Sequence, residues 1–114
     1  MAHPSLTVFE SLPAKERWFC RTRLKLAPLE EVAARTSGID VLDVGCGHGV
    51  LAALLLHAHP QWRVVGIDPD ARKIEWANES IGKNPNAEFH AYTIEQLAAE
   101  RPAAFDCVVI ADVL

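Results

Sequence analysis

The chain has 114 residues, half of them hydrophobic, which is enough for one compact domain and excludes a disordered tail. Eleven Lys and Arg residues against fifteen Asp and Glu residues leave a formal net charge of −4, so no broad cationic surface is available for a nucleic-acid backbone. The three cysteines form no CxxC pair, which fits reduced thiols. We therefore expect no disulfide and no metal site, and the charge balance disfavours nucleic acid as an electrostatic partner without excluding it as a substrate.

Hydropathy along the chain argues against export and against a membrane span. The first twenty residues lack the basic start and apolar core of a secretory signal. The longest uninterrupted apolar run, Val50 to Leu56, has seven residues, whereas a helix needs about 18 to 20 to cross a bilayer. We expect a soluble, cytoplasmic protein without a membrane partner.

The chain before residue 38 has the pattern of a helical arm. Pro13 and Pro28 each suit the first turn of a helix, and they predict helices over 13–25 and 28–36. In the second helix the apolar residues recur at i, i+3 and i+4, which is typical of a helix packed against another element.

From Ile39 onward, short β-rich segments alternate with helices. The predicted strands cover 39–44, 63–68, 87–92 and 105–111, the last with a buried centre, and the predicted helices cover 50–58, 71–81 and 94–100. Such alternation requires right-handed crossovers and a parallel sheet with helices on both faces. The predicted fold class is α/β, a Rossmann-like doubly wound parallel sheet at 38–114, preceded by the helical arm at 1–37.

A glycine-rich turn, with Gly45, Gly47 and Gly49, joins the first predicted strand to an apolar helix. Glycines let a ligand approach the backbone closely, and ligands of such sheets collect at the carboxyl ends of the strands. The dinucleotide pattern GxGxxG would need glycine where Val50 stands, and the phosphate loop GxxxxGK[ST] is absent.

Asp68 ends the second predicted strand, 23 positions after Gly45. In a doubly wound sheet this placement puts a carboxylate beside the ligand crevice, where it can accept hydrogen bonds from a ribose diol. The alternative is an exposed aspartate that only begins the turn at Pro69. The glycine loop favours the ligand-binding interpretation.

Three segments together carry a resemblance to a known family. They are VLDVGCGHG at 41–49, VVGIDPD at 64–70 and FDCVVIADVL at 105–114. In order and spacing they are similar to the first-strand, second-strand and fourth-strand motifs of the class I S-adenosylmethionine-dependent methyltransferases. The arm at 1–37 is similar to the leading helices that often cover the pocket in this family, but it has no motif of its own.

The resemblance implies a binding site for S-adenosyl-L-methionine. In it the backbone from Gly45 to Gly49, Cys46 and Gly47 included, lines the methionine part of the cofactor, and Asp43 orients the loop and the bound amine. Asp68 holds the ribose hydroxyls.

The resemblance implies adenine contacts at two further places. Pro69 or Asp70 flanks the ring on one side, and Thr93 and Ile94 lie near it after the third strand. The family usually has an acidic residue there, whereas this chain has Thr93, with Glu95 as a displaced alternative.

The implied activity is methyl transfer from S-adenosyl-L-methionine to an acceptor, with a small molecule as the default acceptor because the acidic balance offers little for nucleic acid. Alignment of the nucleophile with a sulfonium methyl group supplies much of the rate, so the mechanism demands no catalytic side chain. Asp112, just past the last strand, is the candidate for contacting the nucleophile; the alternative is a solvated residue that closes the strand.

The family's sheet has seven strands, whereas the sequence of this chain predicts four. If the family's order applies, they lie in the order 3-2-1-4. Segment 105–111 would then form an open apolar edge. We expect a fragment of a longer protein; the alternatives are pairing with another polypeptide or dimerisation through that edge. A non-catalytic partner-binding or regulatory module is the alternative function, and the glycine spacing disfavours a nicotinamide-dependent oxidoreductase.

Two polar residues of the loop have simpler interpretations than catalysis. We expect His48 to point toward a neighbouring helix or solvent rather than to act as a base. Cys46 suits a small buried position better than it suits a methyl-accepting thiol. His57 and His59 lack the i, i+4 spacing of a metal pair.

Aromatic and charged residues outside the motifs are expected to be structural. The three tryptophans are predicted to anchor packing, while Phe9, Trp18 and Phe19 either form part of a lid or bury the arm. The expected solvated helix face carries Lys73, Glu75 and Glu79.

Overall fold

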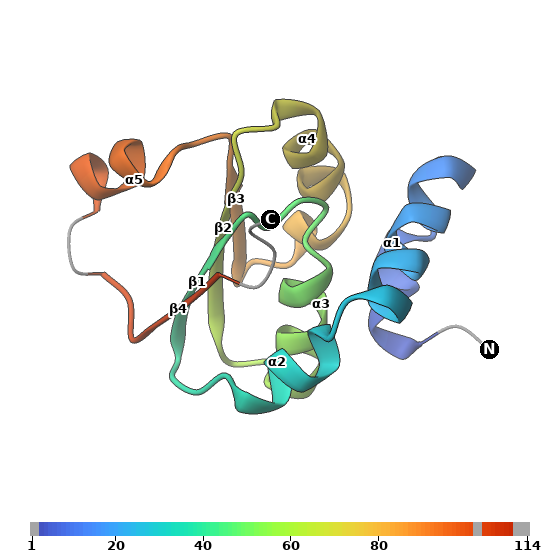
Figure 1. The fold of residues 1–114 in the computed structure, drawn as a ribbon, viewed down its shortest axis with the longest axis horizontal. Coiled ribbons are helices and arrows are strands. Elements are labelled where there is room, and N and C mark those ends of the chain that lie inside the picture. The colour runs from blue at the N-terminus through green and yellow to red at the C-terminus, as the bar shows by residue number, and fades with distance from the viewer. Residues whose placement is uncertain (1–2, 102–103, 111–114) are drawn as a thin grey trace.

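A computed structural model describes residues 3–101 and 104–110 (Figure 1). Its elements in chain order are η1 (Pro4–Phe9), α1 (Ala14–Leu26), α2 (Leu29–Arg35), β1 (Asp40–Val44), α3 (Val50–Ala58), β2 (Arg63–Ile67), α4 (Ala71–Glu79), η2 (Ile81–Lys83), β3 (Ala87–His90), α5 (Ile94–Glu100) and β4 (Cys107–Val109). The predicted β-α-β-α-β-α-β alternation is confirmed, and the helical arm adds one 3₁₀ helix, η1, that the sequence pattern did not predict.

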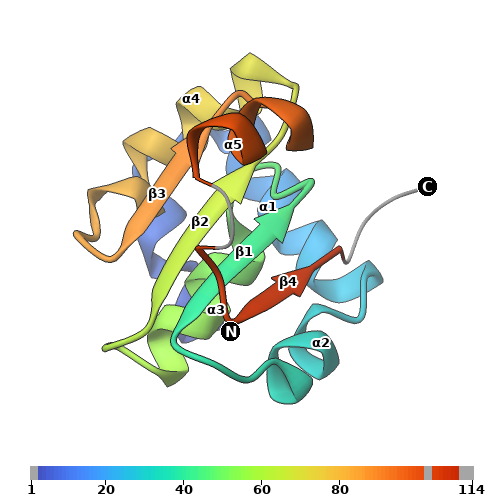
Figure 2. The same ribbon diagram turned by 90° about the vertical axis from the view of Figure 1, so that its left-hand side faces the viewer.

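The four strands form one parallel sheet in the order β3-β2-β1-β4 (Figure 2). This confirms the Rossmann-like fold class and the predicted strand order. The last residues of β1 and β2, Val44 and Ile67, are register partners. Because the strands are parallel, the segments that follow them begin at the same edge of the sheet.

Helices cover the two faces of the sheet unequally (Figure 1). On one face lie α2, α3 and α4, with α1 outside α3, and on the other face α5 is the covering helix. The small core under α5 joins Leu97 to Leu42, Val65 and Ile67. The arm therefore forms a third layer on the α3 side.

The helix α3 is buried all round, as its sequence predicts. Every residue from Val50 to Leu56 is buried, because the sheet covers one side of the helix and the arm covers the other. Leu6, Phe9 and Leu29 of the arm belong to the same core cluster as α3. Arm and sheet share one hydrophobic core, and the division between 1–37 and 38–114 stays a prediction.

The edge strand β4 differs from its prediction in length and burial. It spans Cys107–Val109 rather than 105–111, of which residue 111 lies outside the described range. Its centre was predicted to be buried, but Val108 is 56 % exposed. Val108 pairs with Leu42 on the α5 face, where α5 packs on Leu42 and does not shield the edge strand.

The tryptophan prediction was wrong for one residue of three. Trp62 and Trp76 pack against the main core, whereas Trp18 is 61 % exposed on α1. Phe9 is the aromatic residue that buries the arm. Because α1 is the outermost helix on its side of the sheet, Trp18 is not covered by a further layer of the described chain.

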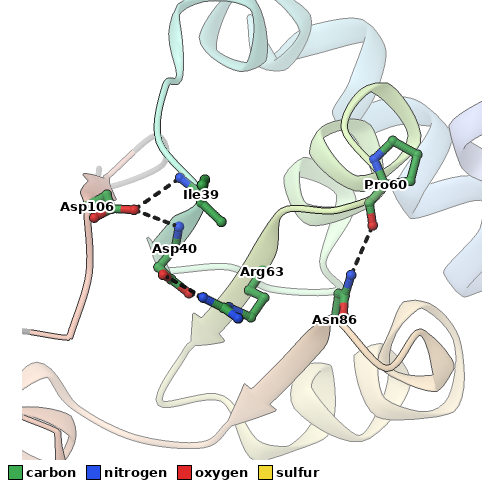
Figure 3. A network of polar contacts seen from close by, with 6 residues as sticks. All are labelled: Ile39, Asp40, Pro60, Arg63, Asn86 and Asp106. Carbon is green, nitrogen blue, oxygen red and sulfur yellow. Dashed lines mark hydrogen bonds and ion pairs between the residues drawn. The ribbon is translucent and has the colours of Figure 1, made fainter.

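The amino edge of the sheet is fastened by polar contacts (Figure 3). The Asp106 carboxylate accepts hydrogen bonds from the backbone amides of Ile39 and Asp40, each at 3.1 Å. Arg63 donates to the Asp40 carboxylate at 2.6 and 3.0 Å, and this hydrogen bond holds the pKa of Asp40 below its ordinary value. These contacts tie β1 to β2 and to the segment before β4.

Candidate cofactor site

At the opposite, carboxyl edge of the sheet, the glycine loop at 45–49 lies beside the end of β2. The backbone amides of Gly45 and Cys46 donate to the Ile67 carbonyl at 2.8 and 3.0 Å. The loop therefore starts as an extension of the β1–β2 pairing and is held next to Asp68.

The three loop glycines all have left-handed backbone angles, with φ of 75° at Gly45, 55° at Gly47 and 89° at Gly49. Other residues rarely adopt these angles, so the loop conformation explains the glycine pattern. A Cβ on Gly49 would lie 2.7 Å from Ile81 Cγ2, whereas the nearest atom to a Cβ on Gly47 would be Lys73 Cδ at 3.9 Å. Gly49 therefore allows close packing, and Gly47 leaves an accessible stretch of backbone.

The Asp68 carboxylate ties the loop to the turn after β2. Its Oδ2 accepts from the Gly47 amide at 3.0 Å, and its Oδ1 accepts from the Asp70 amide at 2.8 Å. Asp68 thus contributes to the turn and also contacts the glycine loop. Since each ionised carboxylate oxygen has two acceptor positions, both oxygens retain capacity for a ligand hydroxyl.

Cys46 and Asp43 lie on the buried side of the loop, both 3 % exposed. Burial raises the pKa of the Cys46 thiol far above its ordinary value, and the charges of Asp43 and Asp68 raise it further. A thiol is nucleophilic only as the thiolate. Cys46 accordingly fits a small buried residue and not a methyl acceptor.

His48 points toward α1, which is one of the two directions expected of it. Its Nε2 lies 2.8 Å from Glu16 Oε1, and its ring centroid is 4.9 Å from that of Phe19. The sequence reasoning missed Glu16, because no local pattern relates two residues 32 positions apart.

Lys73 departs from the predicted solvated helix face. It is half-buried, and its ammonium lies 5.4 Å from the Phe19 ring centroid. Glu75 and Glu79 are exposed as predicted. The first turn of α4 therefore meets both the glycine loop and the arm.

The predicted adenine contacts lie at the end of β2 and after β3. The exposed Pro69 follows Asp68 directly. Thr93 is the N-cap of α5, where its hydroxyl accepts from the Gln96 amide at 3.2 Å, and Ile94 and Glu95 are exposed. Their roles stay predictions. The catalytic candidate Asp112 lies outside the described residues.

The described parts of the chain offer neither a metal-binding cluster nor a membrane-spanning helix. Residues 3–101 and 104–110 contain no group of three or more His, Cys, Asp or Glu side chains suited to a metal ion. No helix in the same residues is long and apolar enough to cross a membrane.

The residues at this edge fit S-adenosyl-L-methionine. Gly47 leaves the backbone accessible, and Asp68 beside it keeps acceptor capacity for a ribose diol. The comparison with known families agrees with this fit, since a methyltransferase domain model matches residues 41–114. The chain belongs to the class I S-adenosylmethionine-dependent methyltransferases.

Among curated proteins, the chain is 35 % identical to a ubiquinone biosynthesis O-methyltransferase from Bordetella parapertussis over 92 residues, which are 80 % of this chain and 37 % of that protein. It is 33 % identical to the enzyme of the same name from Xanthomonas campestris over 88 residues, 75 % of this chain and 36 % of that one. The chain thus spans little more than a third of these relatives.

Among solved structures, the chain is likewise similar to part of larger methyltransferases. The methyltransferase SibL is 30 % identical with a TM-score of 0.65, covering 88 % of this chain and 30 % of its own. The plantazolicin methyltransferase BpumL, in complex with SAH, is 20 % identical with a TM-score of 0.58, covering 93 % of this chain and 44 % of its own. At that identity the second likeness shows the fold alone.

Proposed function

We propose that this chain is the cofactor-binding part of an S-adenosylmethionine-dependent methyltransferase that acts on a small-molecule acceptor. The observation that carries the proposal is the Gly47 amide at 3.0 Å from the Asp68 carboxylate, at the carboxyl edge of a parallel sheet. This contact brings an accessible loop backbone and a hydroxyl acceptor to one place.

In the proposed complex, the loop backbone lies along the methionine part of the cofactor at Gly45, Cys46, Gly47 and Gly49. Asp43 orients the loop from its buried side. Asp68 accepts from the ribose hydroxyls. Pro69 flanks the adenine, and Thr93 and Ile94 approach it from the end of β3.

The bound cofactor supplies a sulfonium methyl group with a good leaving group. The task of the protein is then to hold the acceptor in line with that methyl group and to keep water away. Asp112 stays the candidate for contact with the nucleophile, as its position after β4 predicts.

A small-molecule acceptor is supported by two observations. The net charge of −4 disfavours a nucleic-acid backbone. The curated relatives at 33 to 35 % identity are named ubiquinone biosynthesis O-methyltransferases, and ubiquinone is a small molecule. The free thiols of Cys20, Cys46 and Cys107 support a cytoplasmic location as part of the same proposal.

A non-catalytic partner-binding module is the second candidate. It is favoured by the edge strand β4, where Val108 and the following Ile110 are each 56 % exposed. Unpaired strand edges invite association with another chain. Cofactor binding separates this candidate from the first.

Calorimetric titration with S-adenosylhomocysteine tests the proposal, with Asp68→Ala as the variant and Asp106→Ala as its matched control. Both substitutions remove an aspartate that accepts backbone hydrogen bonds, at opposite edges of the sheet. We expect wild type and Asp106→Ala to bind alike and Asp68→Ala to bind at least about tenfold more weakly. Equal affinities in all three proteins would contradict the assigned site.

A further inference from the structure

The glycine loop is held from two sides, by the sheet and by the arm. We propose that Glu16 is a positioning residue which, through His48, holds the glycine loop in its cofactor-binding conformation. This inference rests on the proposed function and assigns to the arm a part in cofactor affinity.

The loop needs such an anchor because of its backbone. His48 stands between Gly47 and Gly49, which both adopt left-handed angles and have no side chain to fix them. From the sheet side, Asp68 holds the Gly47 amide at 3.0 Å. On the arm side, the loop is held through the His48 ring, which contacts Glu16 of α1.

The contact between His48 and Glu16 is shielded from water. The His48 side chain is 3 % exposed and the Glu16 side chain 18 %, with 2.8 Å between Nε2 and Oε1. A hydrogen bond to a carboxylate is stronger than one between neutral groups, and water does not compete for a buried one. The contact is therefore able to fix the position of the ring and of the backbone that carries it.

Among the described residues, Glu16 is the hydrogen-bond partner of the His48 ring. Because the carboxylate accepts, the proton lies on Nε2, and among the described residues Nδ1 has no hydrogen-bond partner. Without Glu16, both ring nitrogens would be buried and unpaired, which is costly. Moving the ring toward water would relieve that cost and would displace the loop at the same time.

A second contact lies one helical turn along α1. Phe19 is three residues after Glu16 and shares its helix face. The centroid of the Phe19 ring lies 4.9 Å from that of the His48 ring. The ammonium of Lys73, on α4, lies 5.4 Å from the same Phe19 centroid. Arm, loop and α4 thus meet in one cluster, which His48 enters from the cofactor loop.

The test measures S-adenosylhomocysteine affinity and thermal stability of the whole chain with Glu16→Ala and Glu16→Gln. We expect Glu16→Ala to weaken binding about tenfold, because the loop loses its anchor. Glu16→Gln should retain most of the affinity, since its side-chain oxygen still accepts from His48. Should Glu16→Ala fail to fold, His48→Ala takes its place with the same expected loss.

Two controls separate positioning from general damage. Glu31→Ala removes the same charge from an exposed residue whose contact is Arg35 on the same helix, and it should bind as wild type. Leu29→Val trims a buried arm residue in the core and should lower the melting temperature without a tenfold loss of affinity. Equal losses of affinity in Leu29→Val and Glu16→Ala at equal stability would overturn the inference.

The double variant Glu16→Ala with His48→Ala decides whether the effect passes through His48. We expect it to bind no more weakly than either single variant, whereas additive losses would contradict the inference. If wild type does not bind S-adenosylhomocysteine, the proposed function fails and this inference with it. If Asp68→Ala weakens binding and Glu16→Ala does not, the inference alone fails.

Discussion

At both edges of the sheet an aspartate accepts hydrogen bonds from backbone amides, but only one of the two edges is the candidate site. At the amino edge, Asp106 accepts from the amides of Ile39 and Asp40, and at the carboxyl edge Asp68 accepts from the amides of Gly47 and Asp70. Both aspartates join neighbouring segments of backbone. Neither the residue type nor the number of hydrogen bonds distinguishes the candidate site.

The difference lies in the backbone beside each carboxylate. Asp106 packs on Gly38, whose φ is 119° and on which a Cβ would lie 2.9 Å from Asp106 Cβ, so this backbone is covered. The same edge is closed further by Asn86, whose amide donates to the Pro60 carbonyl at 2.9 Å (Figure 3). Asp68 faces Gly47, also at a positive φ, where a Cβ would meet no atom nearer than Lys73 Cδ at 3.9 Å. A strand-end aspartate becomes a candidate ligand only where the neighbouring backbone is accessible.

The largest effect is expected within the carboxyl edge, from Gly49→Ala. A Cβ there would collide with Ile81 Cγ2 at 2.7 Å and occupy a left-handed position, so we expect a loss of about 2–4 kcal/mol in unfolding free energy. Gly47→Ala has space and should cost about 1 kcal/mol while weakening cofactor binding. Urea denaturation of both variants checks this order, and equal stabilities would show that the loop glycines are equivalent.

At the amino edge we expect a smaller loss that does not involve the ligand. Asp106→Ala removes an acceptor from two exposed backbone amides and should lower the unfolding free energy by about 1 kcal/mol. Urea denaturation with and without S-adenosylhomocysteine measures both properties. A larger stabilisation of wild type than of the variant by the same ligand concentration would mean that the two edges are coupled.

The smallest effect is expected from Arg63→Gln, and it should depend on pH. Its hydrogen bond lowers the folded-state pKa of Asp40, so the pair contributes stability above the ordinary pKa of an aspartate. That contribution is lost as pH falls through the lowered pKa. Melting temperatures from pH 7 down to about pH 2.5 should show wild type and Arg63→Gln converging at low pH. A constant difference would assign the effect to packing.

Local patterns predicted the elements and the place of the candidate site. The apolar run from Val50 to Leu56 indicates a buried helix wherever it packs, and the three loop glycines indicate a turn that only glycine adopts readily. The predicted place of Asp68 in the candidate site follows from its position at the end of a strand, because parallel strands end at the same edge of the sheet. The assignment of cofactor contacts to individual residues stays a prediction.

The contacts between distant segments had no local signal. Glu16 and His48 are 32 positions apart, and no periodicity in either segment marks them as partners. The exposure of Trp18 and Val108 likewise depends on which elements reach them. Hydropathy alone describes both residues as core.

By itself, the sequence determined the strand and helix alternation, the glycine loop and the acidic residue beside it, because propensity, hydrophobic period and turn chemistry act over a few neighbouring residues. The tertiary structure alone decided that the arm lies over the loop, that a carboxylate of α1 holds its histidine, and that the edge strand is exposed. These depend on how layers pack in three dimensions, where burial and hydrogen-bond partners come from residues far apart in the chain.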